Sequence, residues 1–359
     1  MPLSFNYDVL PSIVLGDPTF FTHKVPLMKA LGLRNLWLCT NIYTFWQDSP
    51  EDVFTAKRRL EDEGFEVEAV CVPLGHGGCA LSGGDVPDPT LPSHFRNRID
   101  ASGCRMGNTT CVDQGVIDTY RDIFAVHKEL GFKKIFHDDD LRMGMWGESL
   151  QGCYCPRCLD RFYQKYPQYS GISQTEIAQA RQGEALFDAW ADIQCEAVLR
   201  FLVETTPDGM TAGIMVMHNG DPRHGIDIPR IKAALPDTLF RVGECHFSDA
   251  AFQHPLARPA IERSIKKHLA LIGSVDKAYS ETTTYPVGAL SPANFVEKLR
   301  WEISCGLRNI FLMSGSVFLT DDYWEALISA REELAYLADV TPLPLLDGTP
   351  ITDDFIWHG

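Results

Sequence analysis

Short apolar runs alternate along the chain with longer segments whose apolar residues recur at helical spacing. Such alternation is typical of α/β proteins, since short uninterrupted apolar runs suit buried strands and longer periodic segments suit amphipathic helices. The runs predict eight strands, at Ser12–Leu15, Asn35–Cys39, Phe65–Val72, Lys133–Asp138, Thr211–Met217, Leu239–Gly243, Lys277–Ser280 and Asn309–Met313. Eight strand–helix alternations predict a (β/α)₈ TIM barrel rather than an open doubly wound sheet.

The segments between these runs predict helices, and two of them carry clear start signals. Ser49 is a predicted N-cap followed by Pro50 at the first helical position, and Gly64 is the predicted C-cap. Ser173 is a predicted N-cap inside the largely helical stretch 159–206. The other predicted helices are Val25–Leu31, Gly115–Leu130, Ile228–Leu235, Pro259–Ile272, Pro292–Cys305 and Asp322–Leu337.

We expect residues 1–359 to form a single catalytic barrel domain with two unusual connections. Residues 74–112 are rich in glycine, proline and polar residues and predict a long loop after strand three. A loop of this length in a compact domain is usually functional or disordered. Residues 141–158, after strand four, predict a metal-binding loop because they contain clustered cysteines.

Composition and charge narrow the classes of partner. The 359 residues are 45% hydrophobic and carry a formal net charge of -16, which fits a globular protein with a filled core. Nucleic acids and anionic membrane surfaces select basic patches, so neither is an expected partner. No segment reaches the length of a membrane span, and the N-terminus lacks a secretory pattern. We therefore expect a cytoplasmic enzyme for a neutral or cationic substrate, and the sequence is compatible with a homo-oligomer.

Polar residues gather at the C-terminal ends of the predicted strands. Asp138, Asp139 and Asp140 end strand four, followed by Arg142. His218 and Asn219 end strand five, Glu244 and His246 end strand six, and Glu281 ends strand seven. In a barrel these ends form the rim where chemistry occurs. Alternation along a strand would point Glu244 and His246 to the same face.

The cysteine spacing is the most specific signal in the chain. Cys153, Cys155 and Cys158 lie in C-x-C-x-x-C spacing and can hold three corners of a tetrahedral Zn²⁺ site. Cys111 precedes the helix that leads into strand four and is the predicted fourth ligand, with Cys104 as the competitor. Four sulfur ligands would close the coordination shell and make the zinc structural. An unmetallated thiol cluster is the alternative.

The acidic end of strand four, followed by GCYCPRCLDRF and preceded by a lone cysteine, resembles family 42 β-galactosidases and related clan A glycoside hydrolases. In those barrels a D-N-E-Y run ends strand four and contains the acid/base, a cysteine loop binds zinc, and strand seven supplies the nucleophile. The resemblance places Asp139 at the asparagine, Asp140 at the acid/base and Glu281 at the nucleophile. Here an aspartate replaces the family's glutamate, so the carboxyl group reaches about one methylene less far.

The residues themselves support the same chemistry. Glycoside hydrolysis needs one carboxylic acid and one carboxylate, and crowded aspartates raise the pKa of at least one of them. We predict Asp139, Asp140 and Glu281 as the catalytic carboxyls, with Glu244 as the rival of Glu281. The predicted contacts to a small carbohydrate substrate are Asp138, Arg142, His218, Asn219, Glu244, His246 and Trp324.

Two other functions remain open from the sequence. The first is a lyase, isomerase or hydrolase that acts on a sugar or sugar acid through a divalent cation held by the aspartates, His218 and Glu244. The second is a barrel that binds sugar without catalysis. Neutralisation of the three aspartates is the alternative role for Arg142, and Trp37, Trp46 and Trp146 are further stacking candidates.

Overall fold

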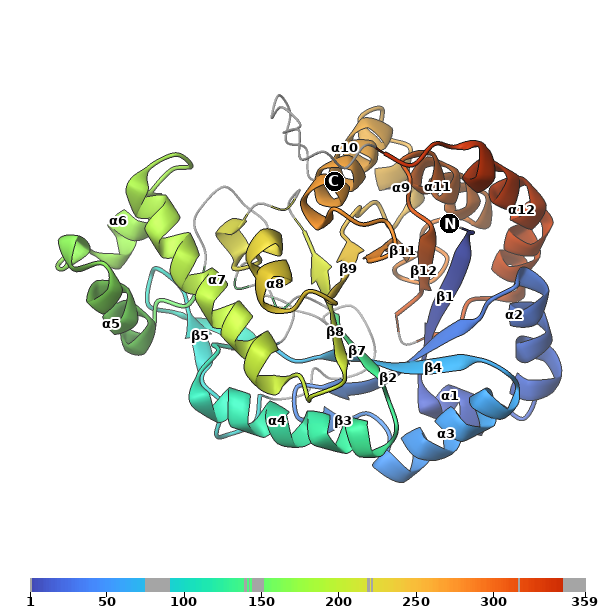
Figure 1. Ribbon diagram of the computed structural model, residues 1–359, viewed down its shortest axis with the longest axis horizontal. Helices are drawn as coiled ribbons and strands as arrows, with labels where there is room; N and C mark the ends of the chain where they lie inside the picture. Colours follow the sequence, from blue (N-terminus) through green and yellow to red (C-terminus); the bar gives the residue numbers. More distant parts are fainter. Residues whose placement is uncertain are drawn as a thin grey trace.

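The computed structural model describes residues 2–74, 91–138, 141, 143, 152–217, 220, 222–315 and 317–344. Eight parallel strands form a closed barrel in the order β1-β2-β4-β7-β8-β9-β10-β12, and β1 pairs with both β2 and β12. The predicted (β/α)₈ TIM barrel is confirmed, with helices packed around the strands (Figure 1). The barrel strands are β1 (Ser4–Val9), β2 (Asn35–Ile42), β4 (Glu66–Val72), β7 (Lys134–His137), β8 (Thr211–Val216), β9 (Leu239–Val242), β10 (Ala278–Tyr279) and β12 (Asn309–Met313).

Helices and short strands connect the barrel strands. In the first half they are α1 (Pro11–Gly16), the π-helical turn η1 (Phe20–Lys24), α2 (Val25–Leu31), β3 (Phe45–Trp46), α3 (Pro50–Asp62), β5 (Asn97–Ile99), β6 (Arg105–Thr110) and α4 (Gln114–Glu129). In the second half they are α5 (Pro156–Lys165), η2 (Pro167–Tyr169), α6 (Gln174–Gln179), α7 (Ala185–Thr205), η4 (Pro222–His224), α8 (Ile228–Ala234), α9 (Asp249–Phe252), α10 (Ala257–Ile272), β11 (Thr282–Thr283), α11 (Pro292–Ser304) and α12 (Asp321–Val340).

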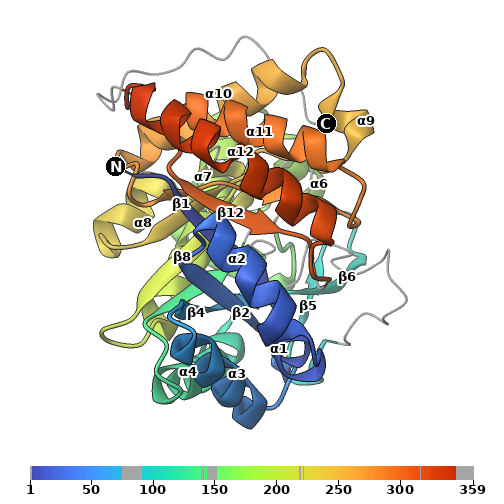
Figure 2. The same ribbon diagram turned by 90° about the vertical axis from the view of Figure 1, so that its right-hand side faces the viewer.

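The first predicted strand is wrong. Ser12–Leu15 lies in α1, which begins at Pro11, a residue whose fixed φ suits the first helical position. The first strand is β1, where apolar Phe5, Tyr7 and Val9 alternate with polar residues. Figure 2 shows α1 and α2 following β1 on the side where α12 completes the ring. A run of four apolar residues is too short to distinguish a buried strand from one turn of a buried helix, which is why its pattern predicts a strand.

Two other regions differ from the prediction. The described part of the predicted 74–112 loop contains an antiparallel hairpin of β5 and β6, whereas residues 75–90 lie outside the described part of the chain. The helical stretch 159–206 is divided into α5, η2, α6 and α7, and Ser173 caps α6 with a complete capping box. In Figure 1, α5 and α6 lie at the edge of the molecule farthest from α12.

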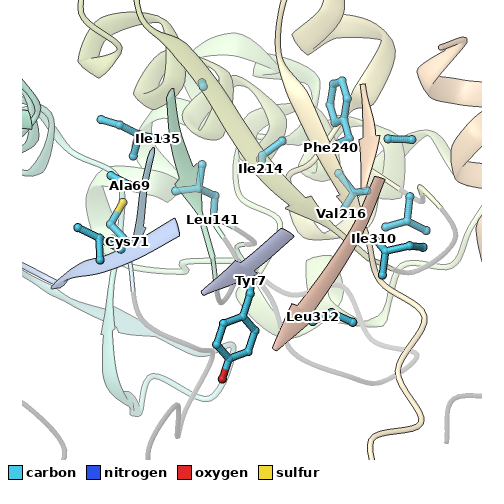
Figure 3. Close-up of a cluster of buried hydrophobic side chains, with 14 of the residues drawn as sticks. Tyr7, Ala69, Cys71, Ile135, Leu141, Ile214, Val216, Phe240, Ile310 and Leu312 are labelled. Atoms are coloured by element: carbon cyan, nitrogen blue, oxygen red, sulfur yellow. The ribbon is translucent and has the colours of Figure 1, made fainter. Parts of the chain in front are cut away.

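Alternating side chains separate the outer core from the barrel interior. Figure 3 shows outward side chains from several strands, including Ala69 of β4, Ile214 of β8 and Ile310 of β12. These residues are buried under the helices. The same buried core cluster includes the other residues labelled in Figure 3: Tyr7, Cys71, Ile135, Leu141, Val216, Phe240 and Leu312.

An aromatic cluster fills the interior of the barrel. The Trp37 ring lies 5.0 Å from Phe136 and 5.6 Å from Phe311, and Phe136 lies 5.4 Å from Tyr279. Gly213 of β8 leaves room for this cluster, because a Cβ there would meet the Phe136 ring at 2.7 Å. The packed rings fill the barrel interior. The side chains nearer the C-terminal ends of the strands therefore form the floor of the opening at that end.

None of the described helices is long and apolar enough to cross a membrane.

Candidate active site and metal centre

Arg241 is the centre of the polar layer above the aromatic cluster. It comes from β9, is buried, and its Nη2 atom forms an ion pair with Asp138 Oδ1 and lies 3.7 Å from Glu281 Oε1. The same Nη2 lies 2.8 Å from the Met215 sulfur, and Nη1 contacts Met313. Asp138 follows β7 and Glu281 follows β10. One guanidinium therefore joins the ends of strands four and seven inside the barrel.

Backbone amides at the end of β9 hold the Glu281 carboxylate. Its Oε2 atom accepts the N–H of Glu244 at 3.1 Å and the N–H of Cys245 at 3.3 Å. Successive amides that point at one anion form a concave site called a nest. Cys245 and His246 have φ of 58° and 64°, a left-handed conformation that non-glycine residues rarely adopt. This left-handed backbone lies directly after the two amides, and hydrogen bonds to a carboxylate favour its ionised form.

Glu244 does not face the barrel interior. Its side chain is 0% exposed, its Oε2 accepts the N–H of Glu281 at 3.1 Å, and it lies 3.7 Å from Lys298 Nζ of α11. Burial, followed by the negative charge of Glu302, raises the pKa of Glu244 well above its usual value. The predicted direct contact of Glu244 with substrate stays a prediction.

His246 also lies in a different environment from the one that strand alternation predicts. The strand β9 ends at Val242, and the left-handed backbone after Glu244 breaks the alternation. His246 Nδ1 donates to the carbonyl of Glu244 at 2.8 Å, and the ring is buried. Burial lowers the pKa of His246 to about 4, so the ring is neutral at pH 7. Its proposed substrate contact stays a prediction.

Asp8 is a site residue that the strand prediction missed. It lies on β1 and is buried, with Oδ2 at 3.5 Å from the Cys39 thiol that donates to it. Burial and then the charge of Asp138 raise its pKa to about 8, although Arg241 opposes the shift. The alternation in the segment SFNYDV carried the signal, because it places Asn6 and Asp8 on one face of a strand.

Trp324 lies in an aromatic cluster beside β1, and its predicted substrate contact stays a prediction. Its side chain is completely buried, stacks at 5.4 Å on Phe318 and meets Tyr7 edge-on at 5.3 Å. Its indole N–H donates to the carbonyl of Leu319 at 3.2 Å. Trp37 is likewise buried in the barrel, and Trp46 stacks on His127 at 4.9 Å.

Five predicted site residues and one tryptophan lie outside the described part of the chain. They are Asp139, Asp140, Arg142, Trp146, His218 and Asn219. Their roles therefore stay predictions.

Buried cysteines meet beside the barrel. The sulfur atoms of Cys111, Cys153 and Cys155 all lie within 4.8 Å of one another, and Cys158 Sγ lies 3.6 Å from Cys155 Sγ. Four sulfurs bound to one Zn²⁺ at about 2.3 Å stand about 3.8 Å apart at the corners of a tetrahedron. Cys104 is exposed in the turn between β5 and β6 and is not in this group. Cys111 is therefore the upstream cysteine of the cluster, as predicted.

Local structure explains how distant cysteines converge. Cys111 follows β6, and Cys155 is the N-cap of α5, with Cys158 in the first turn. The N–H of Tyr154 donates to the carbonyl of Ile99 at 2.8 Å, which fastens the cysteine loop to the hairpin. Hydrogen bonds from Cys111, Cys153 and Cys158 lower the pKa of the Cys155 thiol. The positive end of α5 also favours a thiolate there.

A cavity of about 490 Å³ lies beside the cysteine cluster. Cys155 contributes to its wall, together with residues of the hairpin and of the segment before it. Cys155 is thus the cluster cysteine that lines this cavity. Arg96 and Arg105 lie on the same wall, and Arg96 also approaches Asp113 at 3.6 Å.

No protein-family model matches the sequence, and the curated proteins contain no match either. Solved structures do resemble the fold. The catalytic domain of a β-amylase from Paenibacillus polymyxa has a TM-score of 0.59 at 14% identity over 95% of this chain and 100% of that chain.

Two β-galactosidases are similar to a comparable degree. A catalytic mutant of a GH42 β-galactosidase from G. stearothermophilus has a TM-score of 0.59 at 13% identity, over 95% of this chain and 57% of that chain. A β-galactosidase from Rahnella sp. R3 gives 0.56 at 12%, over 95% and 56%. The chain thus spans little more than half the length of these β-galactosidases. The resemblance inferred from the acidic strand end and the cysteine loop is confirmed as a resemblance of fold.

Proposed function

We propose that the chain is a glycoside hydrolase that cleaves an O-glycosidic bond with Asp139 or Asp140 as the acid and Glu281 as the second carboxylate. One observation carries the proposal: Arg241 contacts both Asp138 and Glu281 inside the barrel. The acidic end of strand four and the carboxylate of strand seven therefore converge. Convergence of two carboxyl groups from different strand ends is what hydrolysis of a glycoside requires.

The surroundings of Glu281 suit the carboxylate that attacks or activates water. Two backbone amides and a nearby guanidinium favour its ionised form. The acid must instead keep its proton, and crowding of like charges at the end of strand four favours protonation of Asp139 or Asp140. Two carboxyl groups about 5–5.5 Å apart would retain the anomeric configuration, and a gap of about 6.5–9.5 Å would invert it.

We further propose that Cys111, Cys153, Cys155 and Cys158 hold a structural Zn²⁺. The donor set fits this ion, because four sulfurs satisfy its tetrahedral preference and leave no open position for substrate. Bound zinc would supply a rigid link between the β5–β6 hairpin and α5. It would take no part in bond cleavage.

The proposed substrate is a small carbohydrate or glycoside. Supporting this, the chain resembles β-amylase and β-galactosidase structures, whose names state that they act on carbohydrates. Asp138, Arg142, His218 and Asn219 are proposed to bind its hydroxyl groups. The net charge of -16 favours a neutral substrate over an anionic one.

The test is hydrolysis of a panel of nitrophenyl glycosides, with NMR detection of the anomer formed first. Glu281→Gln and Asp140→Asn should each lower kcat by about 10³-fold, since each removes a group that acts in the transition state. Glu332→Gln is the matched control, because Glu332 is exposed on α12. Circular dichroism and zinc content should be the same in all variants. Near-normal hydrolysis by both site variants would contradict the proposal.

The same samples separate the two rival functions. Activity lost to EDTA and restored by Mg²⁺ or Mn²⁺, with zinc still bound, would indicate a catalytic divalent cation. Among the described residues, the cysteine cluster is the grouping with metal-holding geometry. Binding of a sugar without turnover of any glycoside would instead indicate a non-catalytic barrel.

A further inference from the structure

We propose that Glu244, Lys298 and Glu302 form a buried positioning unit that holds the Glu281 carboxylate in its reactive orientation. The inference rests on the proposed function, because it assigns Glu281 a chemical role. It replaces the expected substrate contact of Glu244 with an indirect one. Glu244 and its two partners act on Glu281 through backbone groups.

Lys298 joins the two strand ends that carry the site. Its Nζ atom donates to the carbonyl of Cys245 at 2.7 Å and to the carbonyl of Glu281 at 2.9 Å. The side chain is 0% exposed and comes from α11. A single ammonium group therefore fixes the peptide that follows Cys245 and the peptide that follows Glu281. A shift of either strand end would break one of these bonds.

Glu244 and Glu281 exchange hydrogen bonds reciprocally. The N–H of Glu244 binds the Glu281 carboxylate at 3.1 Å, and the N–H of Glu281 binds the Glu244 carboxyl at 3.1 Å. The side chain of each residue thus fixes the backbone of the other. Removing the Glu244 acceptor frees the Glu281 amide, and it also loosens the nest in which the Glu281 carboxylate lies.

Glu302 balances the charge of the unit. It is completely buried, its Oε2 accepts the Thr282 hydroxyl at 2.6 Å, and its Oε1 lies 4.0 Å from Lys298 Nζ. Burial raises the pKa of Glu244 and of Glu302, and the negative charge of Glu302 raises that of Glu244 further. A proton held on one of the two carboxyl groups would leave one negative charge opposite one ammonium group.

A positioning role and a packing role make different predictions. Buried ion pairs contribute little to stability compared with well-packed apolar groups of similar volume. A unit that serves packing alone would alter thermal unfolding without altering the titration of Glu281. A unit that positions Glu281 would alter its titration and kcat even in variants that remain folded.

The experiment compares Glu244→Leu, Glu244→Gln and Lys298→Met with the control Glu332→Gln. Leucine removes the acceptor for the Glu281 amide, glutamine keeps an oxygen there, and methionine removes the two carbonyl contacts of Lys298. Hydrolysis gives kcat, KM and the pH profile. Carbon-13 NMR of labelled glutamate follows the Glu281 carboxyl directly, with Glu281→Gln identifying its signal. The groups that face Glu281 and could perturb the titration are Arg241, Asp138, Lys298, Glu244 and Glu302.

We expect Glu244→Leu and Lys298→Met to lower kcat by at least about 10-fold while KM changes by less than about 2-fold, since positioning acts on the transition state. The acidic limb of the profile and the Glu281 signal should move to higher pH, because fewer hydrogen bonds favour the carboxylate. Glu244→Gln should lose less activity than Glu244→Leu.

An unchanged kcat and an unchanged Glu281 titration in folded Lys298→Met would overturn the proposal. If Glu244→Leu does not fold, Lys298→Met and Glu244→Gln still decide it. If the protein hydrolyses no glycoside, the proposed function fails, and the NMR titration alone then decides whether the unit positions Glu281.

Discussion

At the scale of single residues, the barrel interior concentrates charge where the aromatic packing ends. Asp8, Asp138 and Glu281 surround the single guanidinium of Arg241 among the described residues of this layer. Asp8 has a pKa of about 8 and is largely protonated at neutral pH. A proton on Asp8 reduces the negative charge beside Asp138 and lets Arg241 compensate the remaining carboxylates.

Asp8→Asn should make the protein more stable at alkaline pH. The folded pKa of about 8 lies above the unfolded value of 3.8, so ionisation is disfavoured in the folded state. Stability is therefore lost as pH rises from about 4 to 8, by at most about 1.4 kcal/mol per pH unit. Asparagine abolishes this loss. Urea unfolding at pH 5, 7 and 8.5 measures it, with the exposed Asp122→Asn as control.

Arg241→Met should destabilise the fold by about 3–5 kcal/mol, because it leaves Asp138 and Glu281 without their buried cation. The double variant Arg241→Met with Glu281→Gln should recover part of the loss, since one stranded charge is removed as well. Denaturant unfolding of the four proteins in this cycle gives the coupling energy. Strict additivity would show that the two side chains do not interact.

At the scale of secondary-structure elements, the sequence predicted helix starts more reliably than the behaviour of strand ends. Ser49 accepts the N–H of Asp52 at 3.1 Å at the start of α3, as its position before Pro50 suggested. The direction of Glu244 was not predictable, because β9 ends at Val242, so strand alternation does not extend to Glu244, and left-handed backbone follows at Cys245 and His246. The alternation in Ser4–Val9 is the signal that places Asp8 inside the barrel. It was missed because the first strand was predicted in the apolar run after Pro11.

Ser49→Ala should lower the free energy of unfolding by about 1 kcal/mol, since it removes the hydrogen bond to a free N–H of α3. Ser49→Asp should restore most of the loss. Urea unfolding at pH 7 measures both variants. Equal stability of the alanine variant and the original protein would mean that solvent replaces the cap without cost.

Cys153→Ser should abolish the proposed zinc binding and loosen one region of the molecule. The hairpin β5–β6 and α5 meet through the cysteine cluster, so their amides should exchange faster with deuterium. The amides of barrel strands β1 and β12 should exchange as before. Elemental analysis checks the metal, and Cys104→Ser is the control because Cys104 is exposed. Uniform acceleration across the barrel would contradict a local role.

At the scale of the whole molecule, eight alternations of strand and helix were enough to predict a closed barrel even with its first strand misplaced. Closure depends on the number and order of the elements, which the apolar pattern records along the whole chain. The hairpin of β5 and β6 was not predicted, because its strands are short and polar, as in the segment RMGNTT. The sequence located the site residues only by their position at the ends of strands. That position places them at the rim of the barrel but does not determine which way each side chain points.

The buried histidines and the buried Asp8 change the stability of the fold in opposite directions as pH changes. Burial lowers the pKa of His127, His246 and His268 to about 4 and that of His137 to about 3. Below pH 6.5 these histidines become protonated in the unfolded chain but stay neutral in the folded protein. Their contribution to the stability of the fold therefore falls as pH falls. Asp8 contributes in the opposite sense across the same range. The two effects partly cancel.

His268→Gln should expose this cancellation. It should lower the slope of unfolding free energy against pH by about 1.4 kcal/mol per unit between pH 5 and 6, the value of one proton. Asp8→Asn should raise the slope by a similar amount in the same interval. Urea unfolding at half-unit steps measures both slopes. Parallel curves for His268→Gln and the original protein would show that the buried ring carries no linked proton.

The ion pair of Asp138 with Arg241 and the cysteine cluster at Cys153 have a consequence for engineering. They fix the two ends of the segment 139–152, one inside the barrel and the other beside it. When both ends of a segment are held, doubling its length costs only about 0.6 kcal/mol of closure entropy. Insertions between Met143 and Gly152 should leave the barrel intact, whereas Leu141 and Met143 are buried in the core and the proposed site residues Asp139, Asp140 and Arg142 must be kept. The stretch between Met143 and Gly152 is therefore the natural place to graft new loops when substrate preference is to be redesigned.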